Sequence, residues 1–271
     1  MESRLILSTK RTAQGKTRLD QYFVSPPFKL MTLPVYDNVW QNGLNAMQMS
    51  SSPGLLAGDK VDIRISLAAD TALSLTTQAF TRVQSMHGDD YAHQHSEIRL
   101  ANSAKLSYLP HPLVLHKDSA LKQSTLIYLA PQTELIYGEI VAIGRVLNGE
   151  RFAFRHFASN LKIYDQAKQR LLLSDRIQWR PATADLTALG QMENYSHQGA
   201  LVYCSPAKST LQMKAVLTQI QSRLPQTEDM LIGCSLLNEG GFMLRVLAHR
   251  ADSIQRLFAQ LSSCLKTLKT E

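Results

Sequence analysis

Cysteine is scarce in this chain of 271 residues. The three cysteines, Cys204, Cys234 and Cys264, lie thirty residues apart, and the sequence contains no CxxC motif. An odd number of widely spaced cysteines indicates neither a disulfide framework nor a structural zinc site. We therefore expect reduced thiols, as in a cytoplasmic protein.

Long apolar runs are absent too. Residues 1–23 hold no apolar stretch long enough for a signal peptide, and no segment reaches the roughly 18 apolar residues of a membrane-spanning helix. We therefore expect a cytoplasmic protein with no membrane partner.

The sequence also has no block of one charge. Its net charge of +7 comes from 29 basic and 22 acidic residues that are scattered along the chain. Nucleic-acid-binding proteins gather basic residues into a patch, often interleaved with aromatic ones. We therefore expect no nucleic-acid partner. A general solvated surface or an acidic protein partner accounts better for the positive charge.

Sequence motifs of catalysis are missing as well. There is no GxSxG elbow for a nucleophilic serine and no HExxH pair for a catalytic metal. The cysteines have no recognisable nucleophile setting. Nothing in the sequence points to an enzyme, and we expect a non-catalytic protein.

The sequence is rich in alternating polar and apolar residues, which is typical of half-buried β-strands. No helical stripe interrupts them before residue 185. The predicted strands are 4–8, 60–67, 72–77, 96–101, 105–109, 124–130, 134–144 and 161–165.

An internal repeat runs through these strands. The pattern Leu-Ala-x-x-small-x-Leu occurs at 67–73, at 100–106 and, less exactly, at 129–135. Each copy predicts a strand, a tight turn and a second strand. One such hairpin cannot bury its own apolar face, so we expect the copies to stack as two layered sheets or a solenoid-like coil.

The pattern changes after the β-rich part. We predict a strand at 199–205, a helix at 209–224, a hairpin of 230–237 with 241–248, and an amphipathic helix at 251–269. The expected fold is mainly β: layered or solenoid-like stacked β-sheets with two helices in a C-terminal α/β portion. We expect one domain over 1–271, with a β body over about 1–185 and a β-α-β-β-α portion over about 199–269.

The stretch SPGLLAGDK (52–60) looks at first like a phosphate-binding loop. A P-loop needs four residues between its glycines and then Lys-Ser/Thr before a helix. Here three residues separate Gly54 from Gly58, Asp59 precedes the lysine, and a predicted strand follows. Since the aspartate would also repel phosphate, we expect a glycine turn leading into a strand.

Glu139 lies in the apolar run IYGEIVAIG (136–144), which is typical of a strand buried on both faces. An unpaired buried carboxylate is costly, so Glu139 needs a partner. One candidate is a structural ion pair with Arg145 or another arginine, and the other is a polar passage or metal path. We favour the ion pair, because structural pairs outnumber functional sites.

His93 and His95 lie two residues apart in YAHQHSE. In a strand they would share one face and could act as a ligand pair, with Asp89, Asp90 and Glu97 nearby. This pattern is too sparse for a stable structural site, but a weakly held, transient metal would leave a signature of this kind.

Several segments occur in the order seen in one known family, the urease accessory proteins UreD, called UreH in some bacteria. The chain resembles this family from about residue 20 to 205, and beyond that only in its layout of strands and helices. The segments are PPFKLM (26–31), SPGLLAGDKVDI (52–63), LTTQAFTRVQ (75–84), LSYLPHPLVLH (106–116), YGEIVAIGRVLNGERFAF (137–154) and RLLLSDRI (170–177).

The resemblance implies a non-enzymatic nickel-insertion chaperone, β-rich with two helices. It implies binding to a UreF-type accessory protein, through it to a UreG-type GTPase, and to apo-urease, in a symmetric hetero-oligomer. Nickel would be in transit through an internal tunnel, with no permanently bound cofactor.

By motif, the resemblance implies that Asp59 and Glu139 are acidic residues of the nickel passage. Asp175 stands where the family often has a glutamate, and its shorter side chain makes its part in the passage the least defined. Two alternatives stay open: a β-rich scaffold without a metal path, and an unrelated β-solenoid enzyme or metal-binding protein that uses His93 and His95.

Overall fold

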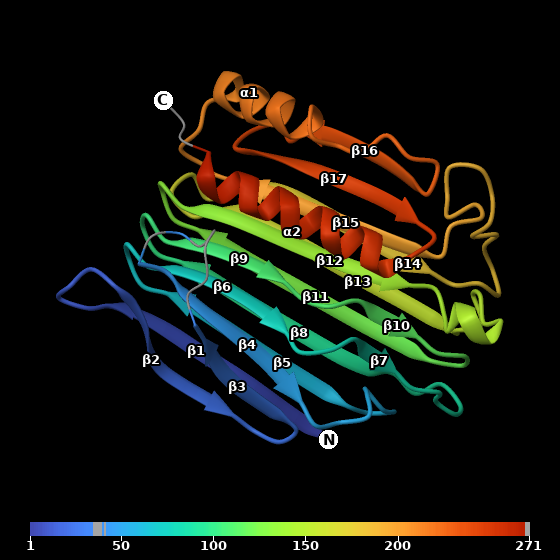
Figure 1. Cartoon of the computed structure of the whole chain (residues 1–271). Helices are drawn as coiled ribbons and strands as arrows, with labels where there is room; N and C mark the ends of the chain where they lie inside the picture. The colour runs from blue at the N-terminus through green and yellow to red at the C-terminus, as the bar shows by residue number, and fades with distance from the viewer. Residues whose placement is uncertain (35–39, 41, 269–271) are drawn as a thin grey trace.

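Two β-sheets lie face to face, and two α-helices cover the outer face of one of them (Figure 1). The computed structural model describes residues 1–34, 40 and 42–268. Across sheet A the strands are β14 (Arg170–Trp179), β13 (His156–Asp165), β11 (Ala120–Leu129), β8 (Ala92–Leu100), β5 (Lys60–Leu67), β1 (Glu2–Arg11) and β2 (Thr17–Val24). Across sheet B they are β16 (Met230–Leu236), β17 (Gly241–Ala248), β15 (His197–Cys204), β12 (Glu134–Ala142), β9 (Lys105–Leu109), β6 (Ala72–Thr77), β4 (Leu44–Ser50) and β3 (Phe28–Leu33). The short strand β10 (Leu113–Leu115) pairs with β12, and β7 (Thr81–Val83) pairs with β10.

From β4 to β13 the chain forms a coil, because it passes repeatedly from one sheet to the other. Strands of successive turns pair in parallel, β5 with β8 and β8 with β11 in sheet A, and β6 with β9 and β9 with β12 in sheet B. The solenoid-like stacking of the two sheets confirms the predicted mainly-β fold.

The internal repeat is the unit of this coil. Leu100 is in register with Leu67 on one side and Leu129 on the other, so the three copies stack residue for residue. Equivalent turn residues share a left-handed backbone, with φ of 56° at Asp70 and 59° at Ser103. The expectation that each copy is a hairpin was wrong, because its two strands belong to opposite sheets and do not pair with each other. Each strand therefore keeps its hydrogen-bonding edges free to pair with the equivalent strand of the next copy.

Six observed strands were not predicted: β2, β3, β4, β7, β10 and β14. β2, β3 and β14 lie at the ends of the sheet paths, and β2 is exposed along most of its length and β3 along half. They therefore carry little of the alternation that marks a half-buried strand. β7 and β10 have three residues each, too few for a pattern.

The C-terminal elements follow the predicted order: β15, α1 (Thr210–Gln221), β16, β17 and α2 (Ala251–Thr267). The predicted helices ran to 224 and 269, and residue 269 lies outside the described part of the chain. One further helical turn, η1 (Val146–Asn148), follows β12. The division into a single domain stays a prediction. Neither α1 nor α2 is long and apolar enough to cross a membrane.

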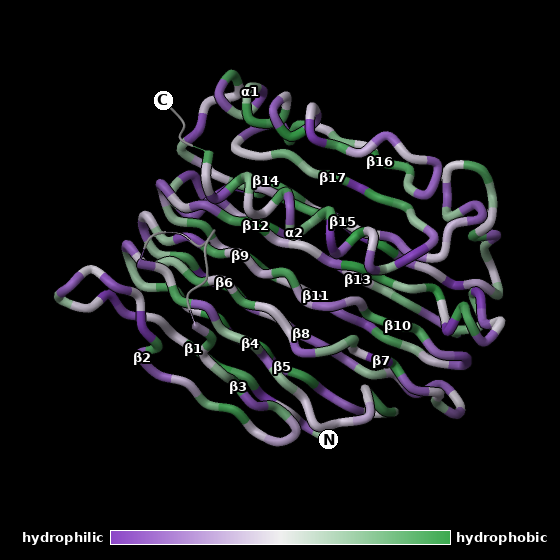
Figure 2. The backbone as a smooth tube through the Cα atoms, viewed as in Figure 1, coloured by the Kyte–Doolittle hydropathy of each residue, from purple (hydrophilic) through white to green (hydrophobic). Residues whose placement is uncertain are grey.

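Two hydrophobic layers hold these parts together. One lies between the sheets, and the other lies between sheet B and the helices. The strands accordingly alternate between hydrophobic and hydrophilic residues along their length (Figure 2). Helix α2 approaches sheet B closely at Gly199, where an added Cβ would lie 2.6 Å from Ile254 Cγ2 and 2.9 Å from Phe258 Cζ.

We predict that Gly199→Ala destabilises the protein by about 1–3 kcal/mol, because the added methyl group overpacks the contact between β15 and α2. The free energy of unfolding in urea measures this. Gly233→Ala, on β16, is the matched control, since its Cβ would meet nothing within 4 Å. Equal stability of the two variants would show that α2 is not packed tightly on Gly199.

Candidate functional site

Polar side chains interrupt the apolar layer between the two sheets and face one another there. On sheet A, Gln123 is in register with Gln94 on one side and Ser159 on the other. On sheet B, Gln48 is in register with Thr77. We call this group the polar seam, and its members are Gln48, Thr77, Gln94, Ser96, Tyr108, Gln123, Thr125, Tyr137, Glu139 and Ser159.

Glu139, on β12, is the carboxylate of the polar seam. Its Oε1 accepts hydrogen bonds from the Tyr137 hydroxyl at 2.6 Å and from Gln123 Nε2 at 3.2 Å. The same amide group donates to Ser159 Oγ at 2.9 Å. Glu139 is thus held by neutral donors from both sheets.

The expected ion pair of Glu139 with an arginine was wrong. Arg145 lies beyond the end of β12 and pairs with Glu150 instead. No lysine or arginine in the described ranges forms an ion pair with Glu139. Within these ranges, the charge on this carboxylate is therefore not neutralised by a cation.

Burial raises the pKa of Glu139 above its ordinary value, and the negative charge of Asp175 raises it further. The hydrogen bond from Tyr137 works in the opposite direction, since it stabilises the ionised form. In turn, burial and the nearby Glu139 raise the pKa of both Tyr137 and Tyr108. These phenols therefore stay protonated and act as donors in the seam.

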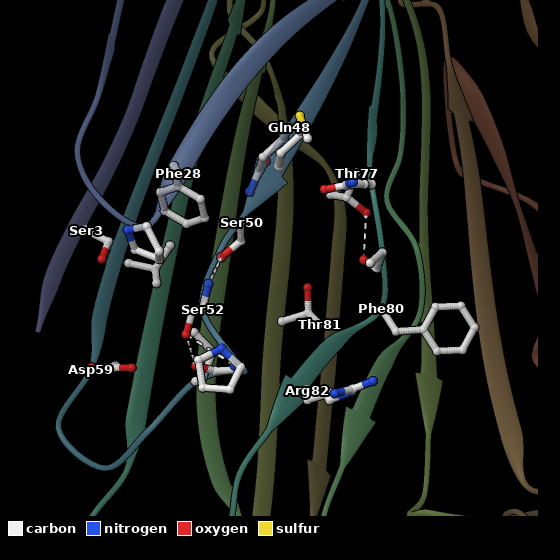
Figure 3. A pocket seen from close by; sticks show the side chains of 18 of the residues that line it. Ser3, Phe28, Gln48, Ser50, Ser52, Asp59, Thr77, Phe80, Thr81 and Arg82 are labelled. Carbon is white, nitrogen blue, oxygen red and sulfur yellow. Dashed lines mark hydrogen bonds between the residues drawn. The ribbon is translucent and has the colours of Figure 1, made fainter.

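A cavity of about 60 Å³ opens beside Glu139, between the sheets. One water needs about 10–15 Å³ of such space, so the cavity can hold a short hydrated path. It adjoins a larger pocket of about 510 Å³, shown in Figure 3, which reaches Asp59. Five residues line both spaces, which are therefore neighbours: Gln48, Thr77, Thr81, Gln94 and His111.

Asp59 stands at the side of the larger pocket, in the turn before β5 (Figure 3). Only 6% of its surface is exposed. Its Oδ1 accepts from the amino group of Met1 at 2.9 Å, and its Oδ2 accepts from the backbone N–H of Leu56 at 2.8 Å. The Met1 amino group thus compensates the charge of Asp59. The hydrogen bond to the Leu56 N–H also fixes the expected glycine turn that leads into β5.

Asp175, on β14, is an ion-pair partner of Arg245 on β17, and the pair bridges the two sheets. Arg245 is in register with Ala200, which is in register with Glu139, so the three share the inner face of sheet B. Arg245 also lines a pocket of about 800 Å³. The three acidic residues named from the sequence therefore lie along one inter-sheet layer, with Glu139 between the other two.

His93 and His95 share one face of β8, as predicted, but it is the outer face of sheet A. Inward-facing residues alternate with them, and His95 Nδ1 forms a hydrogen bond with Ser124 Oγ at 2.8 Å. Within the described ranges, no group of three His, Cys, Asp or Glu side chains is arranged to hold a metal ion. The two histidines are separated from the polar seam by the sheet.

Sequence reasoning missed most of the polar seam, although a signal was present in the repeat. Ile63 on β5 is in register with Ser96, and Ser96 with Thr125, so two of three stacked inner positions are polar. The next inner position reads Val61, Gln94 and Gln123. Aligning the strands that precede the turns of the three repeat copies would have revealed these inward-facing polar residues.

The whole chain, residues 1–271, matches the family described as UreD urease accessory protein. The chain belongs to this family. It is 65% identical over 266 residues to the urease accessory protein UreD of Actinobacillus pleuropneumoniae serotype 7 (strain AP76), covering 98% of both chains. It is 59% identical over 271 residues to UreD of Haemophilus influenzae (strain 86-028NP), covering 99% of this chain and 100% of the relative.

Membership of the UreD family confirms the resemblance seen in the sequence and extends it to the C-terminal portion. The protein is therefore an accessory protein of urease maturation. An accessory role is consistent with the expectation that the protein is not an enzyme.

The raised pKa of Glu139 gives a testable dependence of stability on pH. Its folded-state pKa lies above the ordinary value of 4.5, so its contribution to stability is fully present below that value and is lost as pH rises through the folded-state pKa. We predict that Glu139→Gln, which stays neutral, gains stability over the parent as pH rises above 4.5, because the parent then has to ionise a buried carboxyl group.

Urea unfolding at several pH values measures this difference. Glu97→Gln is the control, because Glu97 lies on the outer face of β8 in a partly exposed pair with Arg99. Such pairs contribute little, so this variant should follow the parent at every pH. A Glu139→Gln variant that becomes less stable than the parent as pH rises would contradict the account of Glu139 as an uncompensated buried acid.

Proposed function

We propose that the protein is a nickel-insertion chaperone that passes Ni²⁺ along the polar seam to urease. The observation that carries the proposal is Glu139: a carboxylate between two sheets, held by neutral donors and paired with no cation of the described chain. Burying such a group is costly, and apolar packing would avoid the cost. A cation in transit would supply the missing charge.

The donor set supports transit rather than storage. Thiolates and groups of imidazoles bind Ni²⁺ firmly, whereas isolated carboxylate, amide and hydroxyl oxygens bind it weakly. The polar seam offers the second kind of ligand, and its one carboxylate faces a cavity with room for water. Nickel would therefore be the cargo of the protein and not a resident cofactor.

The three acidic residues would have different parts in this path. Asp59 lies beside the larger pocket and fixes its wall, Glu139 contacts the cargo in the interior, and the Asp175–Arg245 pair lies beside the pocket of about 800 Å³ that Arg245 lines. Under this proposal the two surface pockets are the openings of the path. The geometry assigns no direction of travel.

The proposed partners follow from the same role. The protein would dock on apo-urease in the cytoplasm and bind a UreF-type accessory protein, which would recruit a UreG-type GTPase. Such a path needs a partner at each opening, in keeping with a symmetric hetero-oligomer. No described feature favours the alternatives of an enzyme or of a metal site at His93 and His95.

We predict that Ser96→Val blocks delivery. Ser96 is buried and lines the interior cavity, so valine would narrow the path and remove a hydroxyl. In cells that express urease with its accessory proteins, the nickel content and activity of urease should fall roughly tenfold or more, as for an added barrier above about 1.4 kcal/mol. Glu139→Ala should act in the same direction.

Ser66→Val is the matched control, since Ser66 is exposed on the outer face of β5. Pull-down of the accessory proteins and thermal unfolding would show that each variant folds and assembles. If Ser96→Val and Glu139→Ala variants fold, bind their partners and load urease at the parental rate, the protein is a scaffold without a metal path.

A further inference from the structure

His111 lies between β9 and β10, with a proline on either side. Among the residues that the structure describes, it is the one that lines the interior cavity, the larger pocket near Asp59 and a third space of about 560 Å³ beside α2. His111 therefore stands between the interior cavity and two spaces at the surface. Glu139 lines the same interior cavity.

Contacts with the strands hold His111 in place. Its backbone N–H donates to Thr77 Oγ1 at 2.8 Å, and the backbone N–H of Thr81 donates to the carbonyl of Pro112 at 3.0 Å. The Phe80 ring packs beside the imidazole, with a centroid distance of 6.1 Å. The side chain is half-buried, so it is both restrained and reachable from the cavity.

A contact with Thr77 distinguishes the two ring nitrogens of His111. The Thr77 hydroxyl lies 3.3 Å from Nδ1, a contact in which either atom can donate, according to the tautomer of the imidazole. No described residue forms a hydrogen bond with Nε2, so this nitrogen is the one left open.

A histidine with one nitrogen held by a hydroxyl and the other without a hydrogen-bond partner among the described residues has the arrangement of a metal ligand with its outer-shell support. Neutral imidazole suits first-row transition metals such as nickel. We propose that His111 is a transient Ni²⁺ ligand, binding through Nε2 at the junction of the three spaces, with the Glu139 carboxylate as the anionic ligand of the same cavity. This inference rests on the proposed passage of nickel through the polar seam.

One imidazole and one carboxylate bind Ni²⁺ weakly. Weak binding is required here, because a cation in transit has to be released again. Oxygen atoms of amides, hydroxyls and water would complete the coordination, and they exchange readily because none is a strong ligand. His111 would select a transition metal over Mg²⁺ or Ca²⁺, which prefer oxygen ligands. The polar seam alone offers no such preference.

The test is a titration of the full-length protein with NiCl₂, followed by NMR of its histidine side chains. Paramagnetic Ni²⁺ broadens the signals of the imidazole that it binds. We expect the His111 signals to broaden at a nickel concentration roughly fivefold lower than those of His93 and His95, a modest affinity difference. Earlier broadening of the outer-face histidines would overturn the proposal.

Two variants sharpen the result. Glu139→Gln should raise the nickel concentration needed to broaden His111, and His111→Gln should lower the nickel content of urease in cells. His249→Gln, in the exposed turn before α2, is the control and should leave both readouts unchanged.

The same variants separate a passage that lacks this ligand from the absence of any passage. If Ser96→Val lowers urease nickel but neither His111→Gln nor the titration shows an effect at His111, then nickel uses the passage without this ligand. If Ser96→Val and Glu139→Ala also leave nickel delivery unchanged, the passage itself is wrong.

Discussion

The in-register stacking of the three repeat copies is the constraint on which the rest of the structure depends. Because Leu67, Leu100 and Leu129 are aligned, every inner position before them is aligned as well. Side chains in a strand alternate between its faces, so a slip by one residue would turn the apolar set outward. The same register that buries the leucines gathers the inward-facing glutamines and hydroxyls into the polar seam.

Much of the fold could be predicted from local pattern, since the repeat, the alternating strands and both helices have periodicities that the sequence displays. The edge strands could not, because an exposed strand is defined by its hydrogen-bonding neighbour and not by its own side chains. The partner of Glu139 could not be predicted for a related reason. Arg145 is near in sequence but lies past the strand end, whereas Gln123 is brought near only when the two sheets stack.

Those features of the candidate site that depend on local pattern could be predicted from the sequence. Burial of Glu139 followed from its apolar neighbours, and the cost of burying a carboxylate follows from electrostatics alone. The sequence did not show which cation lies beside each carboxylate. Asp59 is compensated by the Met1 amino group and Asp175 by Arg245, and both contacts are long-range.

Of these three acids, Glu139 alone has no cation beside it in the described structure, and this difference bears on how a metal would enter. Its raised pKa means that proton binding is one way for Glu139 to shed the cost of its buried charge. A divalent cation is the other, and it competes with the proton for the same oxygens, so that metal entry releases a proton. The neutral donors Tyr137 and Gln123 can hold the carboxylate in either state, because each hydrogen bond is made to Oε1 and leaves the second oxygen free. The proposed passage would thus have an interior that stays intact when empty and accepts a cation without rearranging the fold.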